Sequence, residues 1–104
     1  DCFTIAELLT YEAMGLAPRG QGARALEDGT VYRGGALPVN LSGGLKAKGH
    51  PVGATGVSMH ALAFRQLTYQ AGDLQVPGAE LGLLFNMGGS AVANYVSVLE
   101  ARKV

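Results

Sequence analysis

Glycine is the residue type that most constrains the fold of this chain. Sixteen of the 104 residues are glycine, about twice the usual share of roughly 7%. They follow no three-residue period, which excludes a collagen-like helix. Glycine adopts backbone conformations that other residues avoid, and it lets a backbone approach a ligand closely. The sequence therefore predicts many special backbone positions, most densely over residues 40–56.

The overall composition is that of a single folded domain. Hydrophobic residues make up 48% and charged residues 15% of the chain, so a packed core is expected and disorder is not. Eight basic and eight acidic residues give no net charge, which argues against nucleic acid as a partner. No apolar run is long enough to span a membrane. Cys2 is the single cysteine, so an internal disulfide and a cysteine zinc site are excluded, no metal is expected, and a reducing, cytoplasmic setting is favoured.

The first part of the chain predicts two helices. Thr4 to Glu7 matches a capping box, in which the Thr4 hydroxyl and the Glu7 carboxylate satisfy each other's backbone amides. A helix is expected from about 4 to 15, followed by a short one within 20–28. The chain begins with Asp1-Cys2-Phe3 rather than with Met, which suggests that it belongs to a longer protein.

The second part predicts a short strand, a helix and a hairpin. The strand is expected near 37–40, with Pro38 at its entry, and apolar residues at helical spacing predict a helix over 53–71. Residues 81–85 and 91–99 read as two strands joined at Gly88-Gly89-Ser90. This order indicates an α/β fold, with a small sheet whose edges need a partner.

The densest chemical signal is the segment 40–56, which contains Gly49-His50-Pro51. His50 precedes a predicted helix N-terminus, where the helix dipole disfavours a positive charge, so a neutral histidine that donates a hydrogen bond is expected. From chemistry alone, a functional histidine and one satisfied by the backbone are equally good explanations.

Three segments together resemble the C-terminal half of thiolases. Gly49-His50-Pro51, followed by Gly53-Ala54-Thr55-Gly56, resembles their histidine-bearing signature. Asp1-Cys2-Phe3 looks like the end of the His-Asp-Cys-Phe loop of sterol-carrier-type thiolases. Residues 85–91 are similar to the final glycine-rich thiolase loop. The three segments occur in the family's order and cover essentially the whole chain, so residues 1–104 are interpreted as a thiolase C-terminal domain fragment, with a mixed sheet and flanking helices.

The resemblance implies an acyltransferase that acts on acyl-CoA thioesters, by Claisen condensation or by thiolytic cleavage of 3-ketoacyl-CoA. His50 would assist the nucleophile and stabilise the thioester oxygen. The Gly88 amide would sit in a second oxyanion hole, and Cys2 would act as acid and base at the α-carbon. Gly49 and Asn86 are expected beside the substrate. Coenzyme A would be a substrate, and no covalently bound cofactor is expected.

The departures from the family pattern leave alternatives open. Most thiolases have a cysteine where this chain has Asn86, and the nucleophile belongs to an N-terminal half that this sequence does not contain. The chain alone is therefore expected to be inactive, with that missing half as a partner and with homo-oligomers expected. The alternatives are a thiolase-like aldolase, which cleaves β-hydroxyacyl-CoA with a small partner protein, and a non-catalytic interaction subunit.

Three weaker features carry less weight. Residues 20–25 match a dinucleotide-binding pattern, but neither the preceding strand nor the distant acidic residue is present, so nucleotide binding is not expected. Lys46 and Lys48 are placed to meet coenzyme A phosphates, although solvated lysines are the more common case. His60 is most simply a helix-face residue.

Overall fold

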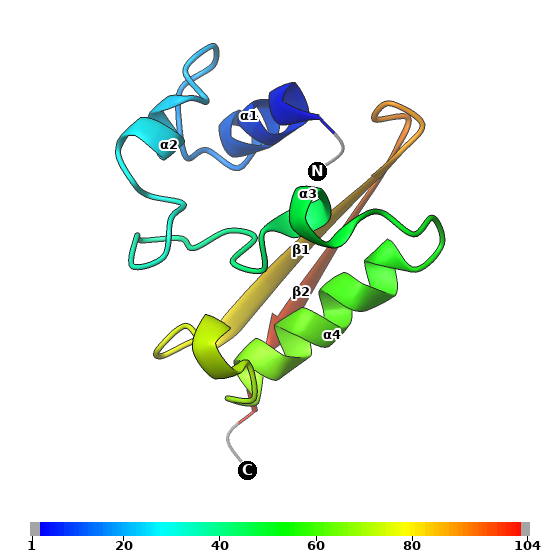
Figure 1. The fold of residues 1–104 in the computed structure, drawn as a ribbon. Coiled ribbons are helices and arrows are strands. Elements are labelled where there is room, and N and C mark those ends of the chain that lie inside the picture. The colour runs from blue at the N-terminus through cyan, green and yellow to red at the C-terminus, as the bar shows by residue number, and fades with distance from the viewer. Residues whose placement is uncertain (1–2, 103–104) are drawn as a thin grey trace. The chain divides into compact units, whose positions relative to one another are not determined.

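The computed structural model describes residues 3–102. The chain divides into two compact units, Asp1–Lys48 and Gly49–Val104. The first contains the helices α1 (Thr4–Ala13), α2 (Arg24–Glu27) and α3 (Gly44–Lys48). The second contains α4 (Thr55–Leu67), a 3-10 turn η1 (Gly72–Leu74) and the strands β1 (Leu81–Gly88) and β2 (Ala93–Glu100) (Figure 1).

The core of the first unit forms where α1 and α2 meet the following loop. Tyr11, Ala25 and Val31 are almost fully buried there, and Leu16, Leu26 and Val39 pack around them. The helix predicted over 4–15 is confirmed, ending at Ala13. Within the predicted range 20–28, α2 is a single turn that ends before Gly29.

Gly22, in the turn that precedes α2, lies directly against α1. A Cβ atom at this position would overlap the Leu8 carbonyl. The Gly22 amide donates instead to Glu12 Oε1 over 3.0 Å. The close approach of this turn to α1 therefore accounts for this glycine of the dinucleotide-like pattern.

The predicted capping box at the start of α1 is wrong. Phe3 is the N-cap residue, and its carbonyl accepts the amides of Ala6 and Glu7 at 3.1 and 3.3 Å. The Glu7 carboxylate accepts a hydrogen bond from the Tyr11 hydroxyl, one turn further along the helix. The buried phenol needs an acceptor, so the carboxylate pairs with Tyr11 rather than with the backbone of Thr4.

The strand predicted over 37–40 is also wrong. Leu37 and Val39 donate to the carbonyls of Thr30 and Val31 at 3.0 and 2.9 Å, but Pro38 between them has no amide to donate. The backbone of Asn40, with a φ of 50°, then leaves the extended region. Two isolated hydrogen bonds tie this segment to its neighbour without forming a β-ladder.

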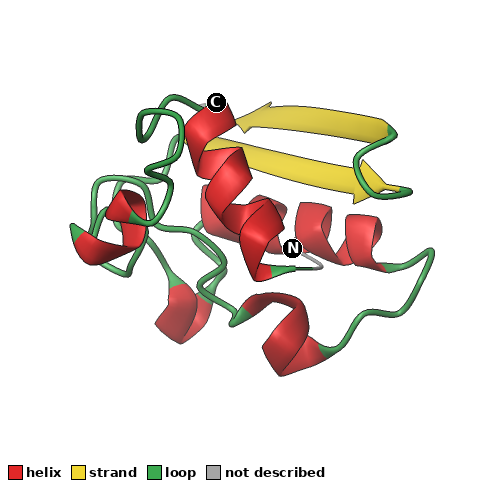
Figure 2. Cartoon of the chain, turned by 90° about the horizontal axis from the view of Figure 1, so that it is seen from above, coloured by secondary structure: helices red, strands yellow, loops and turns green. Residues whose placement is uncertain are grey.

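The second unit is a β-hairpin with α4 packed along one face (Figure 2). β1 and β2 pair antiparallel, from Leu81 opposite Glu100 to Gly88 opposite Ala93. The predicted hairpin and the α/β class are confirmed. Among residues 3–102 the sheet holds these two antiparallel strands, without the third strand and the mixed pairing that were expected.

Small side chains bring α4 close to the hairpin. A Cβ atom at Gly82 would lie 3.7 Å from Ala63 and 3.6 Å from Leu67. Two positions further along β1, the Leu84 side chain is 5% exposed. The helix predicted over 53–71 is therefore confirmed as the element covering this sheet face, although it is shorter than expected. Its C-cap is Thr68, and Tyr69 follows with a left-handed φ of 58°.

A polar contact also joins α4 to the hairpin. His60 Nδ1 donates to the Gly56 carbonyl over 2.7 Å. A carbonyl can only accept, so Nδ1 carries the proton and Nε2 accepts from the Ser97 hydroxyl at 3.0 Å. His60 thus lies on a face of α4, as predicted, and there it also links the helix to β2.

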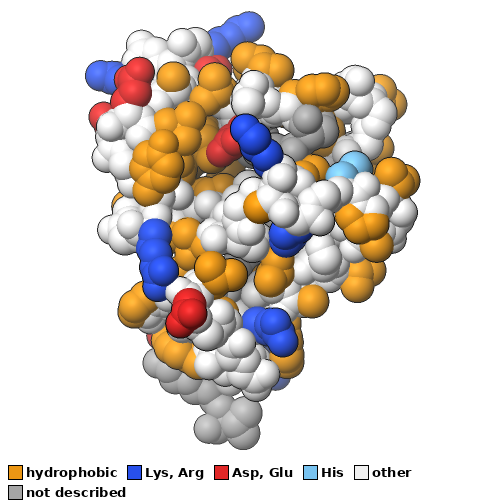
Figure 3. All heavy atoms as spheres, in the orientation of Figure 1, with side chains coloured by type: hydrophobic (Ala, Val, Ile, Leu, Met, Phe, Trp, Pro, Cys, Tyr) orange, Lys and Arg blue, Asp and Glu red, His pale blue; other side chains and the backbone are white. Residues whose placement is uncertain are grey.

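The opposite face of the hairpin is apolar and exposed. Side chains alternate between the two faces of a strand, and on this face Leu81, Leu83, Val96 and Val98 are all more than half exposed. Figure 3 shows the molecule from the side of α4, so this face of the hairpin is turned away from the viewer, and hydrophobic side chains are also visible on the side that is shown. Among the described residues, no helix has the length and apolar character needed to cross a membrane.

Burial in the first unit predicts a pH dependence of stability. Desolvation, followed by the hydrogen bond to Glu7, raises the pKa of the Tyr11 hydroxyl far above its ordinary value of 10.0. Above pH 10.0 the Tyr11 hydroxyl ionises in the unfolded chain but stays protonated in the folded chain. The free energy of unfolding should therefore fall by up to about 1.4 kcal/mol per pH unit. Urea unfolding between pH 9 and 11 measures this slope.

The variant Tyr11→Phe should remove that part of the slope, because no phenol remains to ionise. Tyr69→Phe is the matched control, since Tyr69 is 59% exposed. An unchanged slope in Tyr11→Phe would show that another group causes the alkaline loss of stability.

Candidate functional site

His50 lies in a sharp turn that precedes α4. Gly49 and Gly53 flank the turn, with left-handed φ angles of 79° and 84°. No atom lies within 4 Å of a Cβ built at either position. These two glycines are therefore needed for backbone conformation and not for space. The turn leaves the His50 side chain exposed.

The Pro51 carbonyl organises the first turn of α4. It accepts the amides of Ala54 and Thr55 at 2.9 and 3.1 Å. The Thr55 hydroxyl lies 3.3 Å from the same oxygen and 2.6 Å from His50 Nδ1. The His50 ring is therefore tied to the helix through Nδ1, which leaves Nε2 as the nitrogen available to a ligand.

Asn86 approaches the same turn of α4 from β1. A Cβ atom at Gly56 would lie 3.0 Å from Asn86 Nδ2, so the amide packs directly against this glycine. Thr55, which holds His50, and Gly56, which receives Asn86, are consecutive in the chain. His50 and Asn86, both singled out from the sequence, thus lie against consecutive residues in the first turn of α4.

Gly88 is the last residue of β1, opposite Ala93. The turn that follows contains Gly89, Ser90 and Ala91, with positive φ angles of 55°, 54° and 71°. Left-handed backbone is costly for a residue with a Cβ atom, and such strain persists where the surroundings impose it. The Asn94 side chain supports the turn by donating to the Ala91 carbonyl over 2.9 Å.

The remaining predicted residues lie elsewhere. Cys2 is outside the described residues. Lys46 and Lys48 are exposed on α3.

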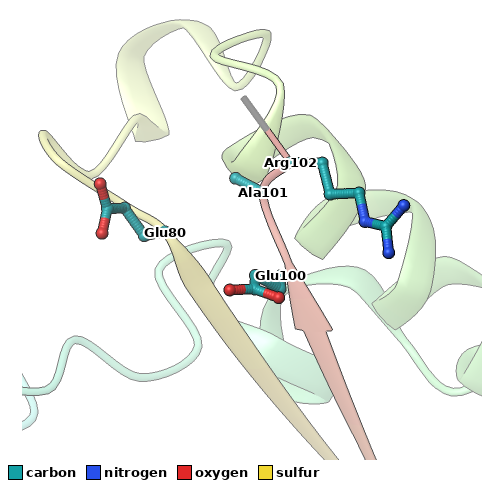
Figure 4. A pocket seen from close by; sticks show the side chains of 4 residues that line it. All are labelled: Glu80, Glu100, Ala101 and Arg102. Carbon is teal, nitrogen blue, oxygen red and sulfur yellow. The ribbon is translucent and has the colours of Figure 1, made fainter. Parts of the chain in front are cut away.

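A surface pocket lies at the opposite end of the hairpin from Gly88. It is lined by Glu80, Glu100, Ala101 and Arg102 (Figure 4). Since Leu81 pairs with Glu100 at one end of the ladder and Gly88 with Ala93 at the other, this pocket is separate from the His50 turn.

Thr55 is the contact that sequence reasoning missed. Its position five residues after His50, at the first helical residue after a proline turn, was the available signal. The partner of His60 gave no such signal, because Ser97 lies 37 residues further along the chain.

Comparison with known families identifies the family of this chain. The family model described as "Thiolase C-terminal domain-like" matches residues 1–101. The chain therefore belongs to the thiolase C-terminal domain-like family, and the resemblance inferred from its motifs is confirmed.

Several curated relatives are thiolases or sterol carrier proteins. The acetyl-CoA acetyltransferase of Methanothermobacter thermautotrophicus is 50% identical over 86% of this chain and 24% of its own length. Human sterol carrier protein 2 is 53% identical over 88% of this chain and 17% of its own. The benzoylsuccinyl-CoA thiolase subunit BbsB of Thauera aromatica is 40% identical over 89% and 24%. The chain thus spans about a quarter or less of these relatives.

The contact between Gly56 and Asn86 gives a direct test of the site geometry. In Gly56→Ala, the new methyl group must displace the Asn86 amide by a few tenths of an ångström, since it would otherwise lie only 3.0 Å from Nδ2. The helix itself should gain up to about 1 kcal/mol from the replacement of glycine. We expect a shifted side-chain amide signal for Asn86 in ¹H–¹⁵N NMR spectra, without loss of thermal stability.

Gly82→Ala is the matched control for that measurement. Its added methyl group meets Ala63 and Leu67 at ordinary contact distances, so the Asn86 signal should stay in place. An unshifted Asn86 signal in Gly56→Ala would contradict the packing described here.

Proposed function

We propose that this chain is the His50-bearing part of an acyl-CoA thiolase. The complete enzyme would transfer acyl groups between coenzyme A thioesters, by Claisen condensation or by thiolytic cleavage of 3-ketoacyl-CoA. The observation that carries the proposal is the His50 turn, in which Nδ1 is held by Thr55 at 2.6 Å and Nε2 is left for the substrate. The names of the thiolase relatives support the same reaction class.

In the direction of cleavage, His50 Nε2 takes the proton of the nucleophilic cysteine, which the N-terminal half supplies. The thiolate attacks the 3-keto carbon, and the bond between C2 and C3 then breaks. The electron pair moves onto the acetyl-CoA enolate, whose oxygen accepts a hydrogen bond from the Nε2–H of His50. This charge-assisted bond is stronger for the enolate than for the neutral thioester, which is how it lowers the barrier.

Cys2 gives its thiol proton to C2 of the enolate. The incoming coenzyme A thiol returns a proton to Cys2 as its sulfur attacks the acyl-cysteine, and the cysteine leaves as a thiolate.

The Gly88 amide would stabilise the tetrahedral intermediates. Gly49 and Asn86 would line the substrate beside His50. Asn86 replaces the usual cysteine and has no proton to exchange near neutral pH, which leaves Cys2 as the only thiol of this chain for the role.

The missing N-terminal half is the partner proposed for this chain, and the chain alone would be inactive. The exposed apolar face of Leu81, Leu83, Val96 and Val98 supports a covering partner, because patches of this kind mark interaction surfaces. A homo-oligomer of the complete enzyme and a cytoplasmic location are part of the same proposal.

Two alternatives are separated by activity. An interaction subunit is favoured by the name of BbsB, which is a thiolase subunit. An aldolase is favoured by the loss of the usual cysteine at Asn86. Coenzyme A-dependent cleavage of acetoacetyl-CoA by the full-length protein supports the thiolase. Cleavage of a β-hydroxyacyl-CoA supports the aldolase, and neither activity supports the interaction subunit.

Replacement of His50 tests the proposed mechanism. In the full-length protein, His50→Ala should lower kcat for thiolysis on the order of 10²-fold or more, because both the base and the enolate donor are lost. The matched control is His60→Asn, which removes the other histidine and keeps a donor for the Gly56 carbonyl. Equal losses in both variants would mean that His50 acts only through the fold.

Replacement of Cys2 tests the proton transfer at C2. Cys2→Ala should lower kcat on the order of 10²-fold, while Asn86→Ala should cost much less, since Asn86 moves no proton. Exchange of the α-hydrogens of acetyl-CoA with deuterated solvent measures this step separately. Near-normal exchange in Cys2→Ala would remove the thiol from the mechanism, and an equal loss in Asn86→Ala would place the acid/base role elsewhere.

A further inference from the structure

The Thr55 hydroxyl is the buried polar contact of the site. Thr55 is buried, with 6% of its surface exposed. Its hydroxyl has two neighbours, His50 Nδ1 at 2.6 Å and the Pro51 carbonyl at 3.3 Å. The hydroxyl is therefore fixed between a ring nitrogen that can change its protonation and an oxygen that can only accept.

A hydroxyl group can donate one hydrogen bond and can also accept. When Nδ1 of His50 carries a proton, Thr55 Oγ1 accepts that bond and turns its own hydrogen towards the Pro51 carbonyl. When Nδ1 is unprotonated, the hydroxyl rotates and donates to Nδ1. Both arrangements use the same heavy-atom positions, so no side chain has to move.

The second arrangement leaves no buried group without a partner. The Pro51 carbonyl gives up the hydroxyl hydrogen but keeps the amides of Ala54 and Thr55, at 2.9 and 3.1 Å. Rotation of the hydroxyl therefore carries no penalty for an unsatisfied carbonyl. A backbone carbonyl or carboxylate in place of Thr55 would hold only the form of His50 that is protonated at Nδ1.

We propose that Thr55 is a positioning residue that keeps the His50 ring in one orientation through every protonation state of the reaction. This inference rests on the proposed function, in which His50 Nε2 first accepts a proton from the nucleophile and then donates to the enolate oxygen. Nδ1 carries a proton both before and after that transfer, so it donates to Thr55 Oγ1 in both states and Nε2 stays aimed at the reacting atoms. The second arrangement of the hydroxyl would hold the other neutral form of His50, in which Nε2 carries the proton and Nδ1 does not.

The test compares Thr55→Val with Thr55→Ser in the full-length protein. Valine has nearly the shape of threonine but no hydroxyl, whereas serine keeps the hydroxyl. We expect Thr55→Val to lower kcat for thiolysis on the order of ten-fold or more, as does the loss of groups that orient metal-binding histidines or the histidine of a catalytic triad. KM should change little, and Thr55→Ser should recover most of kcat. Thr68→Val is the matched control, because the Thr68 hydroxyl bonds only backbone carbonyls at the other end of α4.

A second measurement does not depend on activity. The ¹⁵N chemical shifts of the two His50 ring nitrogens report their protonation and hydrogen bonding. The Nδ1 shift should change in Thr55→Val and return towards the original value in Thr55→Ser. Equal losses of kcat in both variants, or an Nδ1 shift that is the same in all of them, would overturn the inference.

The two proposals fail in different ways. If His50→Ala loses turnover while Thr55→Val keeps it, the positioning role of Thr55 is wrong and the proposed function stands. If His50→Ala keeps turnover, the proposed function is wrong. In that case, even if the Nδ1 shift still depends on the Thr55 hydroxyl, the bond between Thr55 and His50 would be structural only. That outcome also overturns the inference.

Discussion

The hydrogen bonds at the Pro51 carbonyl are the interaction on which the rest of the second unit depends. Two amides and a hydroxyl converge on this oxygen, and together they fix where α4 begins. The start of α4 sets the direction of the helix along the hairpin and the position of His50 beside Thr55. Because the proline ring fixes its own φ angle, this junction begins from a restricted backbone.

Close approach between α4 and the hairpin is the second condition for the site. Glycine at position 56 lets the Asn86 amide of β1 lie against the helix, and glycine at position 82 of β1 lets Leu67 of the helix lie against the strand. The bond from Ser97 to His60 adds a directional contact between these two points. Bulkier residues would separate the layers and move Asn86 away from the turn that holds His50. The small residues therefore contribute to the site as much as the reactive ones.

The elements that could be predicted are those in which local signals agree with packing. Helical spacing of apolar residues located α4, and β-branched residues with a glycine turn located the hairpin. The strand at 37–40 failed because Pro38 interrupts the donors that a ladder needs. The capping box failed because the buried Tyr11 hydroxyl competes for the Glu7 carboxylate, and burial of that phenol is a property of the folded core.

The sequence by itself determined the family and pointed to the candidate site residues, because Gly49-His50-Pro51 and the final glycine turn are contiguous motifs that can be read along the chain. Only the tertiary structure decided which partners those residues have. The contact of Asn86 with Gly56 and the bond of Ser97 to His60 join positions 30 or more residues apart, and no local pattern encodes such pairs. They arise when α4 packs on one face of the hairpin, since burial of apolar surface selects that face and the polar contacts follow from it.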